Sequence, residues 1–330
     1  MKHLKTYGLF ESRTGLTADQ EAFLNKYTKG TWTLNPATGL VDVKGDFNCS
    51  YKKLEDFKGV KFGKVTGDFN CKENKLTSLE GAPQEVGGDF DCSSNNLTSL
   101  AGGPQKVDGG FTCWYNELTS LSGAPQKVDG DFHCHWNQLT SLAGAPQEVG
   151  GEFDCNINKL TSLKGAPQKV GGEFDCTYNQ LTSLAGAPQE VGGRFSCHHN
   201  NLTSLEGAPQ EVGGWFSCSE NKLTSLKGAP QKLDGDFGCD AFELEKEEWN
   251  LKGWLKVLKE GSPEAQKLIL TILSAEELNK EIQKDPTGMI MKLKEIWNDE
   301  NFKKTRAKLV WPKGFGEEAD LVGGLNSIGF

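Results

Sequence analysis

The sequence predicts an α/β repeat fold: a β-solenoid of about ten rungs with a parallel concave sheet, an N-terminal α/β cap and a helical C-terminal region. The ten cysteines of this 330-residue chain are 22 residues apart once and 21 residues apart eight times, and a phenylalanine precedes each of them by two residues. A fixed period between about 20 and 50 residues is the signature of stacked repeats. The pattern is lost towards both ends of the chain, which predicts the caps.

The repeat unit assigns a role to each fixed position. Written from Asn95 to Asn116, it reads N-x-L-T-S-L-x-G-x-P-Q-x-V-x-G-x-F-x-C-x-x-N. Phe and Cys are two residues apart, so both point to one side of a strand, and we expect them to stack with the Leu and Val columns as a hydrophobic spine. The Asn three residues after Cys is expected to hydrogen-bond the backbone of adjacent rungs. The Pro-containing segment is expected to turn the chain along the convex side.

The cysteines are predicted to be reduced core thiols. One Cys per rung places equivalent residues side by side rather than in pairs, and residues 1–10 lack the apolar core of a secretory signal. We therefore expect a cytoplasmic location, which for a phage-encoded chain is the host cytoplasm, with the virion as the alternative. A secreted, disulfide-bonded protein is the rival interpretation.

The string F-x-C-x-x-N-x-L resembles the second half of the leucine-rich repeat pattern L-x-x-L-x-L-x-x-N-x-L, with Phe and Cys in two Leu positions. The Pro-containing segment is similar to that of the short bacterial class of these repeats. The resemblance covers residues 45–240, about 60% of the chain. The strings G-T-W-T-L-N-P-A-T-G-L-V-D-V (residues 30–43) and L-T-S-L-x-G-A-P-Q also resemble uncharacterised leucine-rich repeat proteins of tailed phages.

Residues 1–44 are predicted to form the N-terminal cap. Thr17 and Gln20 have the spacing of a capping box at the start of a helix over residues 16–28. Short strands over 31–34 and 40–43 flank a turn-forming segment and predict a hairpin. Residues 1–11 resemble the capsid-targeting leaders of phage internal head proteins, which are cut after a Glu such as Glu11. The alternative is an ordinary amphipathic first turn that packs on the cap.

Residues 241–313 are predicted to be helical, and they form either a C-terminal cap or a small docking domain. Trp249, Trp254, Leu255 and Leu258 have helical spacing, and further helices are expected to start at Ser262, at Ser274 and at residue 287, the last one ending near 309. Residues 314–330 are rich in glycine and are expected to form a flexible tail.

Composition and motifs exclude several classes of function. The net charge is −9 with only three arginines, which argues against a nucleic-acid or anionic-membrane partner. No apolar run reaches the length of a membrane span. No phosphate loop or nucleophile elbow is present. Cys239-Asp240 resembles the C-x-D nucleophile of bacterial ligases that carry leucine-rich repeats, but Cys239 is the tenth repeat cysteine. We therefore predict neither an enzyme nor a cofactor.

The positions that vary between repeats predict the binding site. Residues before Phe, between Phe and Cys, and after Cys point away from the spine, and Trp, Tyr and His gather in these columns and at the next position, where the strand ends. Exposed rings on a rigid sheet are typical of protein-binding hot spots, whereas neutral drift of a solvated face is the alternative. The predicted partner-binding residues are Trp114, Tyr115, His133, His135, Trp136, Glu152, Asp154, Glu173, Asp175, Tyr178, His198, His199 and Trp215.

Two possible metal sites are less favoured than side chains that are simply solvated. His133, His135 and Asp154 could ligate an ion such as zinc, and Glu152, Asp154, Glu173 and Asp175 form a carboxylate square on adjacent rungs that could attract calcium. We predict that the site holds no metal.

The function that the sequence favours is non-catalytic protein recognition on the concave face, in a phage- or bacterium-encoded protein that interacts with its host. The alternative is a structural or head-packaged phage virion protein, and an enzyme in the C-terminal helical segment is less favoured. We expect a protein partner, no nucleic acid, no membrane, and a monomer or weak oligomer.

Overall fold

The computed structural model describes residues 15–245, 249–270, 295–296 and 299–306. The chain forms two compact units: unit 1 comprises residues 1–160 and 165–172, and unit 2 comprises residues 161–164 and 173–330. The predicted leader (1–11), the predicted helix at Ser274, the predicted helix start at residue 287 and the predicted tail (314–330) lie outside the described residues. Among the described residues, no helix combines the length and the apolar character needed to cross a membrane.

Unit 1 begins with the predicted helix and hairpin. Helix α1 (Ala18–Tyr27) starts with the expected capping box, in which Gln20 N donates to Thr17 Oγ1 (3.2 Å) and Thr17 N donates to Gln20 Oε1 (2.9 Å). Strands β1 (Thr28–Leu34) and β2 (Val41–Asn48) form an antiparallel hairpin. Both strands are longer than predicted. Strand β2 continues through Phe47 and so also supplies the first rung.

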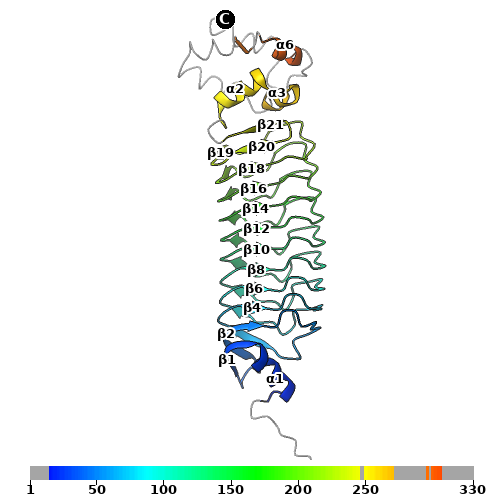
Figure 1. Ribbon diagram of the computed structural model, residues 1–330, viewed down its shortest axis with the longest axis vertical. Coiled ribbons are helices and arrows are strands. Elements are labelled where there is room, and N and C mark those ends of the chain that lie inside the picture. Colours follow the sequence, from blue (N-terminus) through cyan, green and yellow to red (C-terminus); the bar gives the residue numbers. More distant parts are fainter. Residues whose placement is uncertain (1–14, 246–248, 271–294, 297–298, 307–330) are drawn as a thin grey trace, which may run out of the picture. The chain divides into compact units, whose positions relative to one another are not determined.

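Each later rung contributes two short strands rather than the single strand expected. One ends in the repeat Val and the other begins with the repeat Phe, and Figure 1 shows the Phe-bearing strands of unit 1 stacked one above another. The strands are β3 (Phe62–Val65), β4 (Phe69–Asn70), β5 (Glu85–Val86), β6 (Phe90–Asp91), β7 (Lys106–Val107), β8 (Phe111–Thr112), β9 (Lys127–Val128), β10 (Phe132–His133), β11 (Glu148–Val149), β12 (Phe153–Asp154) and β13 (Lys169–Val170).

Equivalent residues of successive rungs lie in register. Strand β10 pairs in parallel with β8 and with β12, and Phe132 is opposite both Phe111 and Phe153. In the second strand column Val149 is opposite Val128 and Val170. This geometry is the predicted leucine-rich-repeat-like β-solenoid. Rungs are numbered below by their Phe, from rung 1 (Phe47) through rung 6 (Phe153) in unit 1 and from rung 7 (Phe174) to rung 10 (Phe237) in unit 2.

The spine is a continuous hydrophobic core in each unit. Every Phe of the ten rungs has 0% of its surface exposed, and all ten cysteines are buried free thiols. The rings stack along the rungs, as Phe132 does between Phe111 (5.2 Å between centroids) and Phe153 (5.5 Å). Phe23 of α1 covers the first ring, Phe47, at 5.5 Å. The column prediction for Phe and Cys is confirmed.

The buried asparagines form a ladder of side-chain hydrogen bonds. Asn137 Nδ2 donates to Cys113 O and to Cys134 O, both at 3.1 Å, and Asn137 Oδ1 accepts from Leu118 N at 3.0 Å. Asn95, Asn116 and Asn158 repeat these bonds one rung at a time. Each Asn therefore joins two rungs from inside the bend, as the sequence predicted.

Unit 2 repeats the same rung and then ends it with an unpredicted strand. Strand β21 turns back antiparallel to β20, with Cys239 opposite Phe242. The strands of unit 2 are β14 (Phe174–Asp175), β15 (Glu190–Val191), β16 (Phe195–Ser196), β17 (Glu211–Val212), β18 (Phe216–Ser217), β19 (Lys232–Leu233), β20 (Phe237–Cys239) and β21 (Phe242–Leu244).

The last ring of the spine is covered by the C-terminal segment. The Trp249 ring stacks on Phe237 at 4.0 Å, and Trp249 Nε1 donates to Pro230 O at 3.2 Å. Helices α2 (Leu251–Glu260), α3 (Pro263–Leu270) and α6 (Glu300–Arg306) pack against one another. The predicted cap of α3 is present, because Ala265 N donates to Ser262 Oγ at 3.2 Å. Trp249 thus closes the end of the solenoid in the way expected of a cap.

Candidate protein-binding face

The predicted site lies on the surface that the sequence predicts to be the concave face, named here the outward face. It consists of the side chains before Phe, between Phe and Cys, and after Cys, together with the residue that follows. In rung 5 Phe132 and Cys134 are buried, whereas His133 and His135 are partly exposed and Trp136 is exposed. Strand alternation produces this division. The fourth position is left-handed in rungs 1 to 9 and includes Tyr115 (φ 54°) and Trp136 (φ 53°).

Four rings of rungs 4 and 5 form one cluster, called here the aromatic patch: Trp114, Tyr115, His135 and Trp136. Trp114 stacks in parallel on His135 (5.5 Å, 5°), and it meets Tyr115 edge-on at 6.2 Å. Tyr115 lies 6.2 Å from Trp136. Tyr115 is 57% exposed and Trp136 52% exposed. The structure therefore brings these four predicted residues together into one accessible apolar surface.

Two carboxylates border the aromatic patch and face its histidines. His133 Nε2 lies 3.6 Å from Glu152 Oε2, and His135 Nδ1 lies 2.9 Å from Asp154 Oδ2. Hydrogen bonding to Glu152 raises the pKa of His133, against an opposing effect of burial. The negative charge of Glu152 is therefore compensated when His133 is protonated.

Three predicted residues of unit 2 form a second, smaller ring cluster: Tyr178, His198 and His199. Tyr178 stacks on His199 at 4.2 Å, and His198 meets Tyr178 and His199 edge-on at 5.7 and 5.1 Å. Burial lowers the pKa of His198. Trp215 is 52% exposed, but in the described part of unit 2 no ring contact joins it to these three residues.

The metal hypotheses are not supported. No three His, Cys, Asp or Glu side chains of the described residues form a group that could hold a metal ion. His133 and His135 face one carboxylate each, and Asp154 Oδ1 accepts from Asn156 N at 2.9 Å. Of the carboxylate square, Glu152 and Asp154 belong to unit 1, and Glu173 and Asp175 belong to unit 2.

A structural use of the outward face was missed by the sequence reasoning. Where the residue between Phe and Cys is Asp or Asn, its Oδ1 accepts the backbone N–H two residues on at 2.9–3.2 Å, as in rungs 1, 2, 3, 6 and 7. Rungs 4, 5, 8 and 9 have Thr112, His133, Ser196 and Ser217 there, and none of these accepts that bond within the described part of the chain. Both rungs of the aromatic patch therefore lack this bond.

The aspartates before Phe also have a structural role. Asp46, Asp68, Asp89 and Asp131 accept, through Oδ1, the backbone N–H of the next rung at 2.7–3.1 Å. Much of the acidic column is therefore bonded to the backbone. Tyr51 of rung 1 is 63% exposed at a left-handed position (φ 60°) and was not among the predicted residues, although it occupies the same repeat position as Tyr115.

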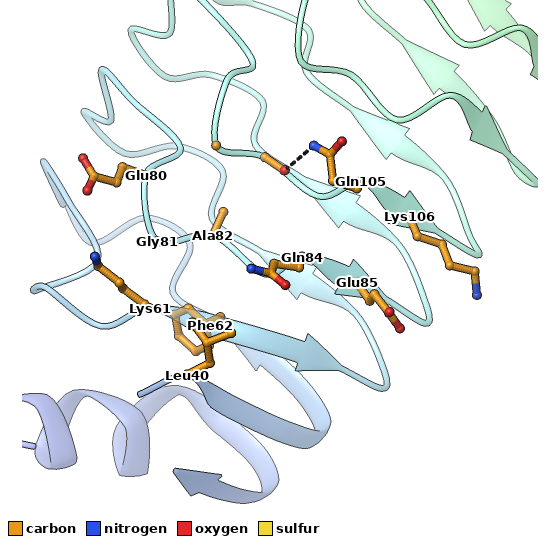
Figure 2. Close-up of a pocket in the computed structure, with 12 residues that line it drawn as sticks. Leu40, Lys61, Phe62, Glu80, Gly81, Ala82, Gln84, Glu85, Gln105 and Lys106 are labelled. Carbon is orange, nitrogen blue, oxygen red and sulfur yellow. Dashed lines mark hydrogen bonds between the residues drawn. The ribbon is translucent and has the colours of Figure 1, made fainter. Parts of the chain in front are cut away.

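An open groove of about 490 Å³ lies elsewhere on unit 1. Figure 2 shows the residues that line it, and Gln105 Nε2 donates to Gly103 O at 3.3 Å there. None of the predicted binding residues belongs to it. Its lining consists of Leu40, Lys61, Phe62, Glu80, Gly81, Ala82, Gln84, Glu85, Gly102, Gly103, Gln105 and Lys106.

Comparison with known proteins gives a distant structural likeness. No family model and no curated protein matches the sequence. Among solved structures, the chain is similar to YopM from Yersinia enterocolitica WA-314, with 15% identity and a TM-score of 0.28, over 60% of this chain and 66% of that chain. The match thus spans just under two thirds of YopM and is too distant to carry an argument. The leucine-rich-repeat-like assignment rests on the geometry of the rungs, and no comparison supports the predicted phage origin.

Proposed function

We propose that this chain is a non-catalytic protein-recognition module and that its partner binds the outward face at the aromatic patch. A solenoid of this kind offers a rigid sheet on which side chains from neighbouring rungs act together. Its binding groups are held by the spine and the Asn ladder before any partner arrives. Association therefore costs little ordering of the protein itself.

The observation that carries the proposal is the packing of Trp114, Tyr115, His135 and Trp136 into one surface. Trp and Tyr supply large contact areas with few rotatable bonds and are enriched in binding hot spots. Tyr115 and Trp136 are also left-handed residues, a conformation that costs a bulky side chain free energy and that Gly or Asn would adopt more easily. Stability alone does not account for aromatic residues at these two positions.

The charges beside the patch indicate how a partner is selected. When His133 is neutral, Glu152 leaves the border of the patch acidic, which favours a partner with Lys or Arg next to an apolar anchor. Protonation of His133 offsets the charge of Glu152. Binding of a basic partner is therefore expected to be stronger above the raised pKa of His133 than below it.

The proposal is tested by selecting binders from an unbiased displayed peptide library on the intact protein. Selected peptides are then measured by biolayer interferometry against Trp114→Ala/Trp136→Ala. Tyr51→Ala is the matched control, because Tyr51 is an exposed aromatic at the same left-handed position outside the patch.

We expect the double variant to lose binding of most selected peptides by at least about tenfold, the effect of about 1.4 kcal/mol, and Tyr51→Ala to keep it. Equal loss in both variants, or no loss in either, contradicts the proposal. Circular dichroism of each variant confirms that the solenoid is intact, since neither Trp belongs to the spine.

A further inference from the structure

Rung 3 shows how the outward face of this fold holds a carboxylate. Asp91 Oδ1 accepts two hydrogen bonds from Ser93, one from its backbone N (3.0 Å) and one from its Oγ (2.6 Å). Asp91 Oδ2 lies 3.4 Å from Lys72 Nζ, and Lys72 is the residue after Cys on the preceding rung. Three groups therefore surround this carboxylate: a backbone N–H, a hydroxyl and a neighbouring cation.

Rungs 8 and 9 of unit 2 have a serine and an imidazole at the equivalent positions and lack the carboxylate. Ser219 stands where Ser93 stands in rung 3, and His198 stands where Lys72 stands in rung 2. The position of Asp91 is taken by Ser217, which is opposite Ser196 in the pairing of β16 with β18. Within the described residues Ser219 N and Ser219 Oγ donate no hydrogen bond, although both donors of Ser93 are used.

A histidine can replace Lys72 in this arrangement. In rungs 5 and 6 His135 and Asp154 occupy the positions of Lys72 and Asp91, and His135 Nδ1 lies 2.9 Å from Asp154 Oδ2. The serine bonds of rung 3 recur in rung 1, where Asn48 Oδ1 accepts from Ser50 N (3.1 Å) and from Ser50 Oγ (2.7 Å). Rungs 5 and 6 show an imidazole beside such a carboxylate.

An arginine lies on the same face. Arg194 has a buried Nε without a hydrogen-bond partner, and no carboxylate of the described residues forms an ion pair with its guanidinium. Its charge acts on His198, since Arg194 contributes to lowering the pKa of that imidazole. Trp215, which is 52% exposed, precedes Ser217 by two residues and shares its outward face.

We propose that this part of unit 2 binds a carboxylate of an acidic peptide, which takes the place that the Asp91 carboxylate has in rung 3. One oxygen accepts from Ser219 N–H and Ser219 Oγ–H, and the other faces His198 and Arg194. The apolar part of the acidic residue and its neighbours packs on Trp215. This site is separate from the aromatic patch of unit 1 and does not depend on the function proposed for that patch.

The surrounding charges favour a carboxylate over a phosphate. Asp175 and Glu220 both act on His198, so the site already carries nearby negative charge. Such neighbours oppose the roughly −1.5 to −2 charge of a phosphate more than the single charge of a carboxylate. The donors available to the ligand are also those that bond a carboxylate in rung 3.

The test follows the backbone amide signals of His198 and Ser219 by ¹⁵N NMR of the full chain during titration with N-acetyl-glutamate amide. N-acetyl-glutamine amide is the neutral control, and inorganic phosphate is the third arm, all at constant ionic strength. We expect a saturable downfield shift of Ser219 with the glutamate compound and none with the glutamine compound. Equal shifts with both compounds, no saturable shift with glutamate, or a response to phosphate alone would each overturn the proposal.

Two variants provide an independent measurement. Ser217→Asp and Ser217→Asn introduce the side-chain acceptors that Asp91 provides in rung 3 and Asn48 provides in rung 1. The new side chain should accept the hydrogen bonds that Ser219 N and Ser219 Oγ can donate. We expect each variant to raise Tm by about 2 °C and to abolish the response of Ser219 to the glutamate compound. The Asn variant adds no charge, so the loss in that variant cannot be ascribed to repulsion. A glutamate response that persists in both variants shows that the carboxylate does not bind here.

Discussion

Replacing the ladder residue Asn137 by Asp changes one buried amide into a carboxylate of almost the same shape. The Asp keeps an oxygen that accepts from Leu118 N, as Asn137 does at 3.0 Å. It loses the donor that reaches Cys113 O (3.1 Å), Cys134 O (3.1 Å) and His135 O (3.2 Å). A second oxygen then faces three carbonyl oxygens.

The cost follows from these contacts. Each of the three carbonyls keeps another partner, from Asn116 Nδ2, Asn158 Nδ2 or Tyr115 N. Only the net value of a hydrogen bond, about 1 kcal/mol, is therefore lost for each N–H that is removed. The Asn137 amide has two N–H groups for these three contacts, so their loss costs about 2 kcal/mol, and burying a charge against carbonyl dipoles adds about 1 kcal/mol or more. We expect Asn137→Asp to lower the free energy of unfolding by about 3 kcal/mol or more at pH 7.

The measurement is equilibrium urea unfolding followed by far-UV circular dichroism, with Gln138→Glu as the control. Gln138 is exposed, so the same chemical change should cost less than about 0.5 kcal/mol there. Burial should raise the folded-state pKa of the carboxyl that Asn137→Asp introduces, so the deficit should shrink as the pH falls and a protonated carboxyl regains a donor. Equal unfolding midpoints for the two variants would refute the ladder as a stabilising element.

Three further predictions concern the spine, the thiols and the histidine beside the patch. Phe132→Ala should lower the free energy of unfolding by about 3–5 kcal/mol, since Phe132 is 0% exposed between two stacked rings; an unchanged thermal melt contradicts this. Burial raises the pKa of Cys49 to about 12 and that of Cys134 well above its ordinary value, so alkylation of these thiols in the native protein should be slow. Titration of the denatured, unreduced protein should find close to ten thiols, and fewer thiols would indicate disulfides. Glu152→Gln should lower the NMR-measured pKa of His133 towards about 6.5. The pKa of His133 is higher in the folded protein than in the unfolded chain. The stabilisation by the His133–Glu152 pair is therefore fully present below the unfolded pKa of about 6.5 and is lost as the pH rises through the folded pKa.

The spine, the Asn ladder and the N-terminal capping box could be predicted because each depends on local rules. Phe and Cys two residues apart must share a side of a strand, and a buried Asn needs partners that a stacked rung supplies. The clustering of Trp114, Tyr115, His135 and Trp136 also followed from the 21-residue register, which places equivalent positions side by side.

Other features depend on which groups the backbone leaves unpaired, and the spacing of apolar residues does not reveal this. In most rungs the strand that precedes the Phe-bearing strand, such as β7 (Lys106–Val107), is two residues long and contains one Val, so it is too short for an alternating pattern. Strand β21 follows the last Cys, where the repeat has ended. The unused donors of Ser219 could be recognised as suited to a carboxylate only from the hydrogen bonds that Ser93 makes to Asp91.

The central claim is that a partner binds the aromatic patch, and footprinting of a complex tests it most directly. Hydroxyl radicals oxidise exposed aromatic side chains, so Tyr51, Tyr115 and Trp136 all report in the free protein, being 63%, 57% and 52% exposed. With a library-selected binder at saturation, we predict that oxidation of Tyr115 and Trp136 falls severalfold while that of Tyr51 stays unchanged. Unaltered oxidation of Tyr115 and Trp136 in the saturated complex would contradict the claim.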